Sequence, residues 1–466
     1  MKKLLVCTLL LIGAISAFAQ DEEKEIKKGW SFGVLPTATF SADNGFQAGA
    51  FGDVYYYGDG NTYPDPLHKI SWEGSYFTKS HRMRLYLAYD SKYLIPGMRV
   101  NTSVTYMNDP LYSFWGFNGP ASFDSGVTNS FTSVSYPLWG NRSFDPNINY
   151  YGMSRQMLRI LANVQGRITD NLNWAAGINF WNWTLGEMKD PAVDGKNYDH
   201  SLTLLNKYKE LGAIKAEEAA GGMSVELNAG FVFDTRDIEA APNRGIWAEA
   251  YLNGAPYAGN ASTGLYSPYL KACTYFRHYI SIPVGFIKAG DPVFAYRLAW
   301  QQTIAGETPF YMIQNNPLLV QRNMISEGFG SSNTIRGLRE NRVLAEGMAW
   351  ANTELRVKLV SFKLANQFFY VAVNPFFDAG IITKAYREDV LRDKVINDPA
   401  LLTITGYNGG SVIYDHDHYK DLIYSGGMGL KIAMNQNFIV SAEFAKCFTP
   451  GLDAGLWLGI GINYQF

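Results

Sequence analysis

The sequence is short of charge. Of its 466 residues, 18% are Asp, Glu, Lys or Arg, and the formal net charge is −2. Soluble domains average about 25% charged residues, so part of this protein's surface is expected to face something other than water. The near-neutral balance excludes the basic footprint of nucleic-acid-binding proteins and the charge excess of disordered ones. We therefore expect no nucleic-acid partner.

Cysteine is also scarce. Of the three cysteines, Cys7 falls in a segment that we expect to be removed, which leaves Cys273 and Cys447. These two could pair in an oxidising compartment, although two separate buried thiols are the preferred interpretation. In either case, no framework of disulfide bonds holds the fold.

Long apolar runs are missing beyond the N-terminus. Lys2-Lys3 precedes the apolar stretch 4–15, and Ala17-Phe18-Ala19 fits a small-x-small cleavage site. This pattern predicts a signal peptide at 1–19, in preference to a short anchor helix, and then a short periplasmic segment at 20–29. No later run of about 18 apolar residues could form a transmembrane helix. Such an exported chain is either a secreted or periplasmic β protein or an outer-membrane barrel.

The usual catalytic signatures are absent from the sequence as well. It contains no G-x-S-x-G nucleophile elbow, no G-x-x-x-x-G-K phosphate loop and no H-E-x-x-H pair. Asp415-His416-Asp417-His418 resembles a metal site, but no third ligand is identifiable, and a solvated loop is the preferred interpretation. We therefore expect no enzyme, no cofactor and no bound metal.

The chain is rich in aromatic residues and glycine, and several of its segments alternate between apolar and polar residues. Aromatics make up 15% of the residues, and there are 45 glycines. Within 348–360, Leu355 and its odd-numbered neighbours form a mostly apolar face, whereas Glu354 and its even-numbered neighbours form a polar one; 155–167 and 224–234 repeat the pattern. Alternation over strands this long is typical of membrane barrels and unusual for a sandwich.

The last segment of the chain shows the alternation most clearly. From Leu456 onward, every second residue is apolar or aromatic, up to Tyr464 and Phe466. A terminal strand that ends on an aromatic residue resembles the recognition signal of bacterial outer-membrane barrels. An ordinary amphipathic strand at a domain end is the alternative interpretation.

Counting the alternating segments gives about sixteen strands, within the usual uncertainty of single-sequence boundaries. This predicts an all-β fold, a 16-stranded antiparallel transmembrane barrel over 30–466. The long connections follow odd-numbered strands, so all of them lie outside the cell if the first strand rises from the periplasm. The predicted strands are 30–40, 45–57, 68–77, 82–90, 98–107, 149–167, 171–183, 222–234, 245–253, 264–279, 291–305, 345–359, 366–384, 421–433, 437–448 and 455–466, and the long connections are 108–148, 184–221, 306–344 and 385–420.

Three short stretches are more specific than the alternation. They are Phe233-Asp234-Thr235-Arg236-Asp237 with the later Pro242 and Arg244-Gly245, then 330–338, and Pro375-Phe376-Phe377-Asp378-Ala379-Gly380. Together with the aromatic C-terminus, they resemble the bacterial surface antigen family. This is the barrel domain of the outer-membrane insertase and translocator superfamily, which includes BamA-like, TamA-like and two-partner-secretion barrels. The resemblance covers essentially the whole mature chain.

The resemblance implies a long loop that folds back into the barrel lumen between the eleventh and twelfth strands. Its hydrophobic-Arg-Gly-aromatic motif corresponds to Ile335-Arg336-Gly337, with Leu338 in the aromatic position. In the family this arginine meets a Glu, a Phe and an Asp, which correspond here to Glu354, Phe376 and Asp378. An aromatic ring and carboxylates both attract a guanidinium. Such contacts could lock the loop in the lumen, or they could only brace the folded barrel.

The first motif is expected at the turn after the eighth strand, toward the periplasm. Asp234, Arg236, Asp237 and Arg244 would form a hydrogen-bonded turn, and Gly245 would permit a close approach of the chain. A structural role is the preferred interpretation of these residues.

Most members of the family carry periplasmic POTRA domains before the barrel, and residues 20–29 are too few to form one. We therefore expect a POTRA-less barrel in the outer membrane of a Gram-negative bacterium. The resemblance implies assembly or translocation of outer-membrane protein or lipid, as an accessory whose partners are outer-membrane lipid and assembly factors or client proteins. A passive solute channel or a structural barrel is the alternative function. The sequence leaves open whether the protein forms a homo-oligomer.

Overall fold

The computed structural model describes residues 26–462, apart from 42, 64, 123–150, 190–202, 239–240, 286–288, 314, 316–327, 331–332, 365–366, 398–413, 415–417, 435–437 and 453–454. The predicted signal peptide at 1–19 and the start of the segment 20–29 lie outside the described residues. The same holds for Tyr464 and Phe466, so the C-terminal recognition signal stays a prediction.

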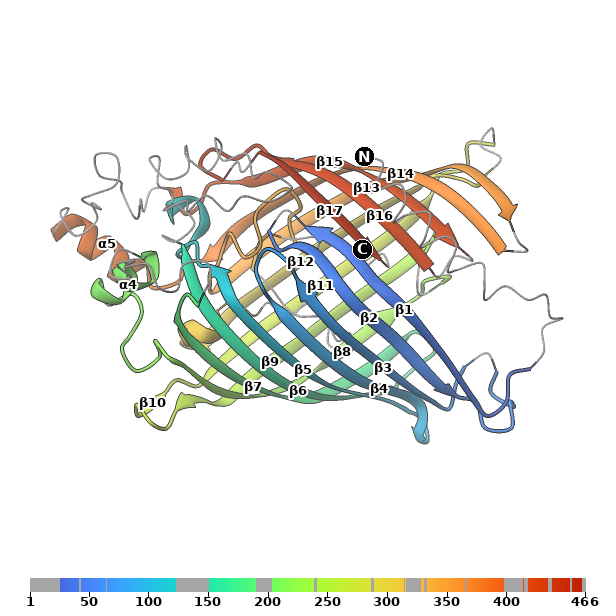
Figure 1. Ribbon diagram of the computed structural model, residues 1–466, viewed down its shortest axis with the longest axis horizontal. Helices are drawn as coiled ribbons and strands as arrows, with labels where there is room; N and C mark the ends of the chain where they lie inside the picture. Colours follow the sequence, from blue (N-terminus) through green and yellow to red (C-terminus); the bar gives the residue numbers. More distant parts are fainter. Residues whose placement is uncertain are drawn as a thin grey trace.

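One antiparallel sheet closes on itself to form a barrel (Figure 1). Apart from β10 and β11, which both pair with β9, each strand pairs with its neighbours in the sequence, and β1 also pairs with β17. The strands are β1 (Trp30–Ser41), β2 (Gly45–Tyr56), β3 (His68–Phe77), β4 (Met83–Ile95), β5 (Met98–Ser113), β6 (Gly152–Arg167), β7 (Leu172–Glu187), β8 (Gly221–Asp234), β9 (Gly245–Asn260), β10 (Leu265–Tyr266), β11 (Tyr269–Ser281), β12 (Val293–Gly306), β13 (Gly347–Leu364), β14 (Gln367–Lys384), β15 (Ile423–Met434), β16 (Phe438–Cys447) and β17 (Leu456–Ile462).

β10 and β11 occupy a single position in the wall, because both pair with β9. Counted once, they give a barrel of 16 strands, which confirms the number predicted from alternation. The prediction of one continuous strand at 264–279 is wrong, since the strand is interrupted at Ser267-Pro268. Pro268 has no N–H to donate to a strand ladder, which accounts for the break.

The two faces of the wall follow the predicted alternation. On β8, Leu227 and Phe231 are 52% and 56% exposed on the outside, whereas Glu226 is only 4% exposed on the other face. On β6, Ile160 is exposed and Arg159 is buried. The outer face is therefore apolar and the inner face carries charges, as in a barrel that crosses a membrane.

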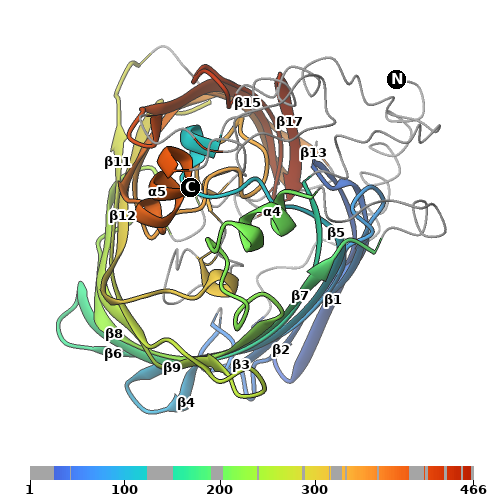
Figure 2. The same cartoon turned by 90° about the vertical axis from the view of Figure 1, so that its left-hand side faces the viewer.

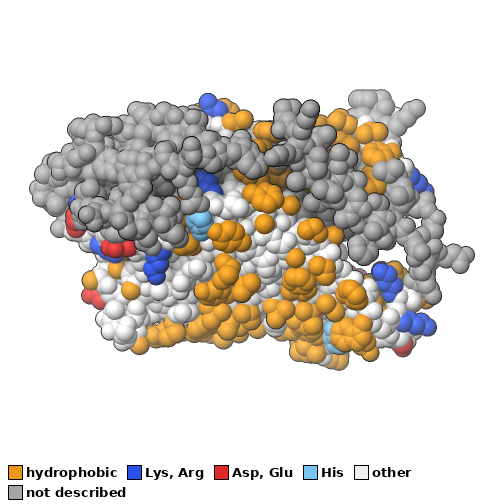
Figure 3. Space-filling view, in the orientation of Figure 1, with side chains coloured by type: hydrophobic (Ala, Val, Ile, Leu, Met, Phe, Trp, Pro, Cys, Tyr) orange, Lys and Arg blue, Asp and Glu red, His pale blue; other side chains and the backbone are white. Residues whose placement is uncertain are grey.

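Hydrophobic side chains form a broad band over the outer wall, and charged side chains appear mainly toward its two ends (Figure 3). At one edge of the wall, aromatic rings continue from β1 to β4. The ring centroids of Trp30 and Tyr56 are 4.7 Å apart, those of Tyr56 and His68 are 6.0 Å apart, and those of His68 and Tyr89 are 5.9 Å apart. Such aromatic girdles at the edge of an apolar band are typical of outer-membrane barrels.

The long connections contain the helices: η1 (Gly119–Ser122), α4 (Leu204–Glu210), η3 (Phe310–Met312) and α5 (Glu388–Asn397). In the view of the barrel from the end that carries α4 and α5, both helices lie over the barrel opening (Figure 2). In the part of the chain that the structure describes, no helix is long and apolar enough to cross a membrane.

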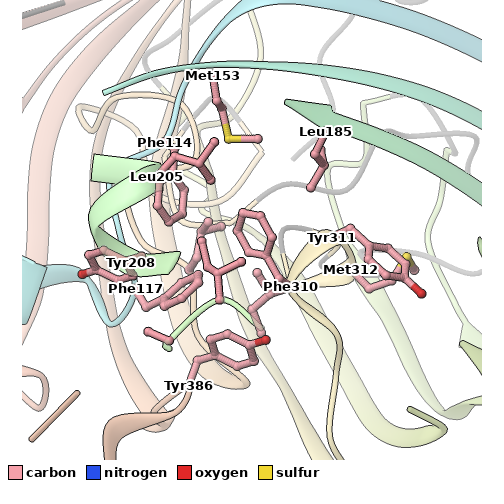
Figure 4. Packing of buried hydrophobic residues seen from close by; sticks show 14 of the residues in the cluster. Phe114, Phe117, Met153, Leu185, Leu205, Tyr208, Phe310, Tyr311, Met312 and Tyr386 are labelled. Atoms are coloured by element: carbon pink, nitrogen blue, oxygen red, sulfur yellow. The ribbon is translucent and has the colours of Figure 1, made fainter. Parts of the chain in front are cut away.

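An aromatic cluster, which we call the loop core, joins all four long connections (Figure 4). At its centre Phe117, from the β5–β6 connection, is fully buried. Its ring centroid lies 5.1 Å from that of Tyr208, 5.8 Å from Phe310 and 4.6 Å from Tyr386, and each contact is edge-to-face. These partners come from the β7–β8, β12–β13 and β14–β15 connections, so one packed core holds all four together.

Candidate functional site

Three strands on one side of the barrel carry buried carboxylates that face the interior. They are Glu354 on β13, Asp378 on β14 and Glu443 on β16, which are 1%, 0% and 7% exposed. Glu354 pairs directly with Phe376, and Asp378 lies two positions further along β14. Because side chains alternate along a strand, Phe376 and Asp378 share the face that Glu354 occupies.

Arg336, in the β12–β13 connection, reaches these carboxylates. Its Nε and Nη2 donate to the two oxygens of Asp378, each at 2.8 Å, and its Nη1 donates to Glu354 Oε2 at 3.1 Å. Its backbone N–H also donates to Asp378 Oδ2 at 3.0 Å. The fork of the guanidinium therefore holds Asp378 in a bidentate, charge-assisted pair, the strongest kind of side-chain hydrogen bond.

The guanidinium also lies on an aromatic face. Its Cζ is 3.5 Å from the ring centroid of Phe376, a distance at which cation–π attraction is strong. Gly427 on β15 leaves the space for this ring, because a Cβ there would lie 2.6 Å from Phe376 Cζ. The structure thus brings Arg336, Glu354, Phe376 and Asp378 into one contact group.

Further charges surround this group and balance it. Asn374 and Arg356 donate to Glu354 Oε1 at 2.7 and 2.9 Å. Lys431 Nζ lies 3.6 Å from Glu354 and 3.9 Å from Glu443. The carboxylates therefore face an equal number of cations, which lowers the cost of burying them. We call this set the Arg336 cluster: Arg336, Glu354, Arg356, Asn374, Phe376, Asp378, Lys431 and Glu443.

The residues that follow Arg336 pack closely against the same wall. Gly337 has φ +87°, and a Cβ at this position would lie 3.1 to 3.2 Å from atoms of Ala445, Lys446 and Cys447 on β16. A side chain would therefore be strained in both conformation and space. Leu338, in the position where the motif predicts an aromatic residue, is fully buried in an apolar cluster.

A second buried ion cluster lies four residues beyond Arg336, and the sequence analysis missed it. Glu340 accepts hydrogen bonds from Arg82, at 2.8 and 3.2 Å, and from Arg155 at 3.3 Å. Both arginines also bond Asp109 Oδ2, and Asn44 Nδ2 donates to Glu340 Oε2 at 2.5 Å. We call Asn44, Arg82, Asp109, Arg155 and Glu340 the Glu340 cluster.

The charge of Glu340 is stable over most of the pH range. Burial by itself would raise the pKa of Glu340, but the guanidinium groups of Arg82 and Arg155 and the hydrogen bonds from Arg82 and Asn44 outweigh burial. Together they lower the pKa to about 2. The contribution of this carboxylate to stability is therefore present at neutral pH and is lost progressively as the pH falls from the pKa of an unfolded glutamate, about 4.3, through the lowered value.

The residues of the β8–β9 turn motif bond mainly to one another. Arg236 donates to both oxygens of Asp234, each at 2.9 Å, and its Cζ lies 4.1 Å from the ring centroid of Trp247. Asp237 accepts the backbone N–H groups of Ile238, Asn243 and Arg244. Burial would raise the pKa of Asp237, but hydrogen bonds to Asn243, Arg244 and Ile238 lower it overall.

The other parts of this turn differ in their contacts. The side chain of Arg244 is exposed. Gly245 has φ +106°, and a Cβ there would lie 2.3 Å from the carbonyl oxygen of Thr235. The turn also reaches β13, since Arg356 of the Arg336 cluster donates to the carbonyl oxygen of Pro242 at 3.4 Å.

The remaining sequence candidates are the Asp415–His418 segment and the two cysteines. His418 pairs with Asp421 at 2.8 Å, and Asp415, His416 and Asp417 lie outside the described residues. Among the residues that the structure describes, no group of three or more His, Cys, Asp or Glu side chains could hold a metal ion. Cys273 and Cys447 are separate buried thiols, which was the interpretation that the sequence analysis preferred over a disulfide bond.

Comparisons with known proteins bear on the fold. No protein-family model matches the sequence, and no curated protein matches it significantly. The crystal structure of BamA from Haemophilus ducreyi lacking POTRA domains 1–3 is similar, with a TM-score of 0.52 and 14% identity over 94% of this chain and 70% of that chain. CdiB from Escherichia coli has a TM-score of 0.51 and 10% identity over 92% of this chain and 63% of that chain. At these identities the likeness shows that this chain shares their barrel fold, and nothing further.

Proposed function

We propose that this protein is an outer-membrane barrel of the insertase and translocator superfamily, with a role in assembling or translocating outer-membrane protein or lipid. The observation that carries the proposal is the contact of Arg336 with Glu354, Phe376 and Asp378. These are the residues that the motif resemblance implies, and they come from separate parts of the chain. The apolar outer wall and its aromatic edge support a location in the outer membrane.

In this proposal the β12–β13 connection lies in the lumen, with Arg336 as its lock. The burial of wall side chains that face the interior supports this position: Arg159, Lys271 and Arg297 are 2 to 4% exposed. Lys271 donates to the carbonyl oxygen of Asn315, in the same connection, at 3.3 Å. Lipid would surround the barrel, and assembly factors or client proteins would be its partners.

The passive solute channel is the rival function, and it requires a lumen that is open at rest. We expect the purified protein in a planar bilayer to show a low resting conductance with brief openings, because in this proposal the β12–β13 connection occupies the lumen. We also expect depletion of the protein in its host to lower the amount of other barrel proteins or of lipid in the outer membrane. A steady, large conductance together with an unchanged outer membrane would favour the passive channel and overturn the proposal.

A further inference from the structure

Among the described residues, the seam between β1 and β17 has a shorter ladder than any other junction of the wall except that of the two-residue strand β10. Within the described residues, only Phe40 with Ile460 and Ser41 with Gly459 are paired across it. On either side of the seam, β1 pairs with β2 along its full length from Trp30 to Ser41, and β17 pairs with β16 from Leu456 to Ile462. Since each ladder pair contributes to holding two strands together, contacts outside the ladder would add most to closure at this seam.

The β12–β13 connection touches the wall on the β17 side of the seam. Arg336 Nη1 lies 3.6 Å from Glu443 on β16, and Gly337 packs against the backbone of the same strand. Arg342 Nη2 lies 3.3 Å from the carbonyl oxygen of Gly451, in the turn between β16 and β17. All these contacts are to β16 or to the turn that leads into β17.

The same short stretch also touches the β1 side of the seam. Asp43, in the β1–β2 turn, accepts the backbone N–H of Glu340 at 3.0 Å and pairs with Arg339 at 3.3 Å. Asn44, in the same turn, donates to the carboxylate of Glu340. The cations that pair with the Glu340 carboxylate are Arg82, directly before β4, and Arg155 on β6.

We propose that residues 336–342 form a brace across the β1–β17 seam, with the Arg336 cluster as its anchor on one side and the Glu340 cluster as its latch on the other. The brace adds contacts across the seam to the short ladder between the described residues of β1 and β17. This inference goes beyond the proposed function, because it holds for a barrel of any role whose seam must stay shut.

Glu340 is the residue on which the latch depends. Its carboxylate is 10% exposed and lies opposite two guanidinium groups that also share Asp109, which is fully buried. A glutamine at this position keeps the size of the side chain but removes its charge. Two arginines would then share one carboxylate, so the attraction that holds the latch closed would fall.

Hydrogen exchange followed by mass spectrometry on the whole protein tests the brace. We expect Glu340→Gln to speed exchange in β1 and β17 by about tenfold or more, with little change in β7 and β8. The matched control is Glu226→Gln, which removes a carboxylate that is equally buried and accepts from Trp181 and Tyr269 on the far wall. This control should leave exchange at the seam at the wild-type rate.

Three results would overturn the brace: unchanged exchange at the seam in folded Glu340→Gln, equal acceleration along all strands, or equal acceleration at the seam by Glu226→Gln. If Glu340→Gln does not fold, Asp43→Asn gives a milder test, because it leaves the carboxylate of Glu340 in place and weakens the contacts of Asp43 to Arg339 and to the Glu340 backbone, together with its attraction to Lys79. A smaller acceleration confined to β1 and β17 would then support the brace, and unchanged exchange there would overturn it.

Discussion

Replacing Arg336 with alanine is expected to release the β12–β13 connection from the wall while the barrel itself stays folded. The substitution leaves Asp378, which is 0% exposed, without its bidentate cation, and it removes one of the cations that face Glu354, which is 1% exposed. Removing one member of a buried ion pair costs about 3–5 kcal/mol, and the cation–π contact with Phe376 is lost as well. The stretch 328–346 should become open to proteases, and the resting conductance in a planar bilayer should rise.

Arg336→Lys separates the charge of this residue from its shape. Lysine keeps the positive charge but has no planar fork to hold Asp378 in a bidentate pair, so we expect an intermediate effect. Arg167→Ala is the matched control, since this arginine pairs only with Asp170 and both side chains are largely exposed. If Arg336→Ala has the proteolysis pattern and the conductance of the wild type, the cluster does not hold the connection.

Phe117→Ala should have the second large effect, at the end of the barrel where the long connections meet. Phe117 is fully buried and contacts rings from each of the other three connections. Truncating a buried phenylalanine to alanine costs about 3–5 kcal/mol of stability. Here the loss destabilises the packing of the loop core and leaves the hydrogen bonds between the strands intact. Limited proteolysis should therefore cut all four connections faster, while the strands stay protected.

The control for this prediction is Phe231→Ala on the outer face of β8, where the ring is 56% exposed. This variant removes the same group of atoms from a place where it packs against no loop, so cleavage of the connections should match the wild type. If Phe117→Ala changes cleavage in only one connection, the four do not share a single core.

The wall could be predicted from the sequence because its pattern is local. The alternation around Glu354 and around Glu226 gives both the strand and the face that each side chain occupies, and both are buried as expected. Pro268 was also readable as a break, since a proline inside a predicted strand disfavours a continuous ladder. The sequence analysis overlooked that signal.

The contacts between loop and wall could not be predicted from local pattern. The contact of Arg336 with Asp378 was expected only from the motif resemblance. Glu340 and its partner Arg82 are separated by 258 residues, and nothing in the sequence around either residue points to the other. Two weaker signals were present, however: Glu340 lies four residues after Arg336, and Phe114 and Phe117 are large aromatics in a connection that was expected to lie outside the cell.

A double-mutant cycle between Arg336 and Asp378 tests most directly whether this ion pair locks the connection. The free energy of opening of residues 328–346 would be measured by hydrogen exchange for the wild type, Arg336→Ala, Asp378→Ala and the double variant. We predict a coupling of about 2 kcal/mol or more between the two positions, because each substitution removes the same contact. Effects that add within about 0.5 kcal/mol would show that the two residues act independently and would contradict the lock.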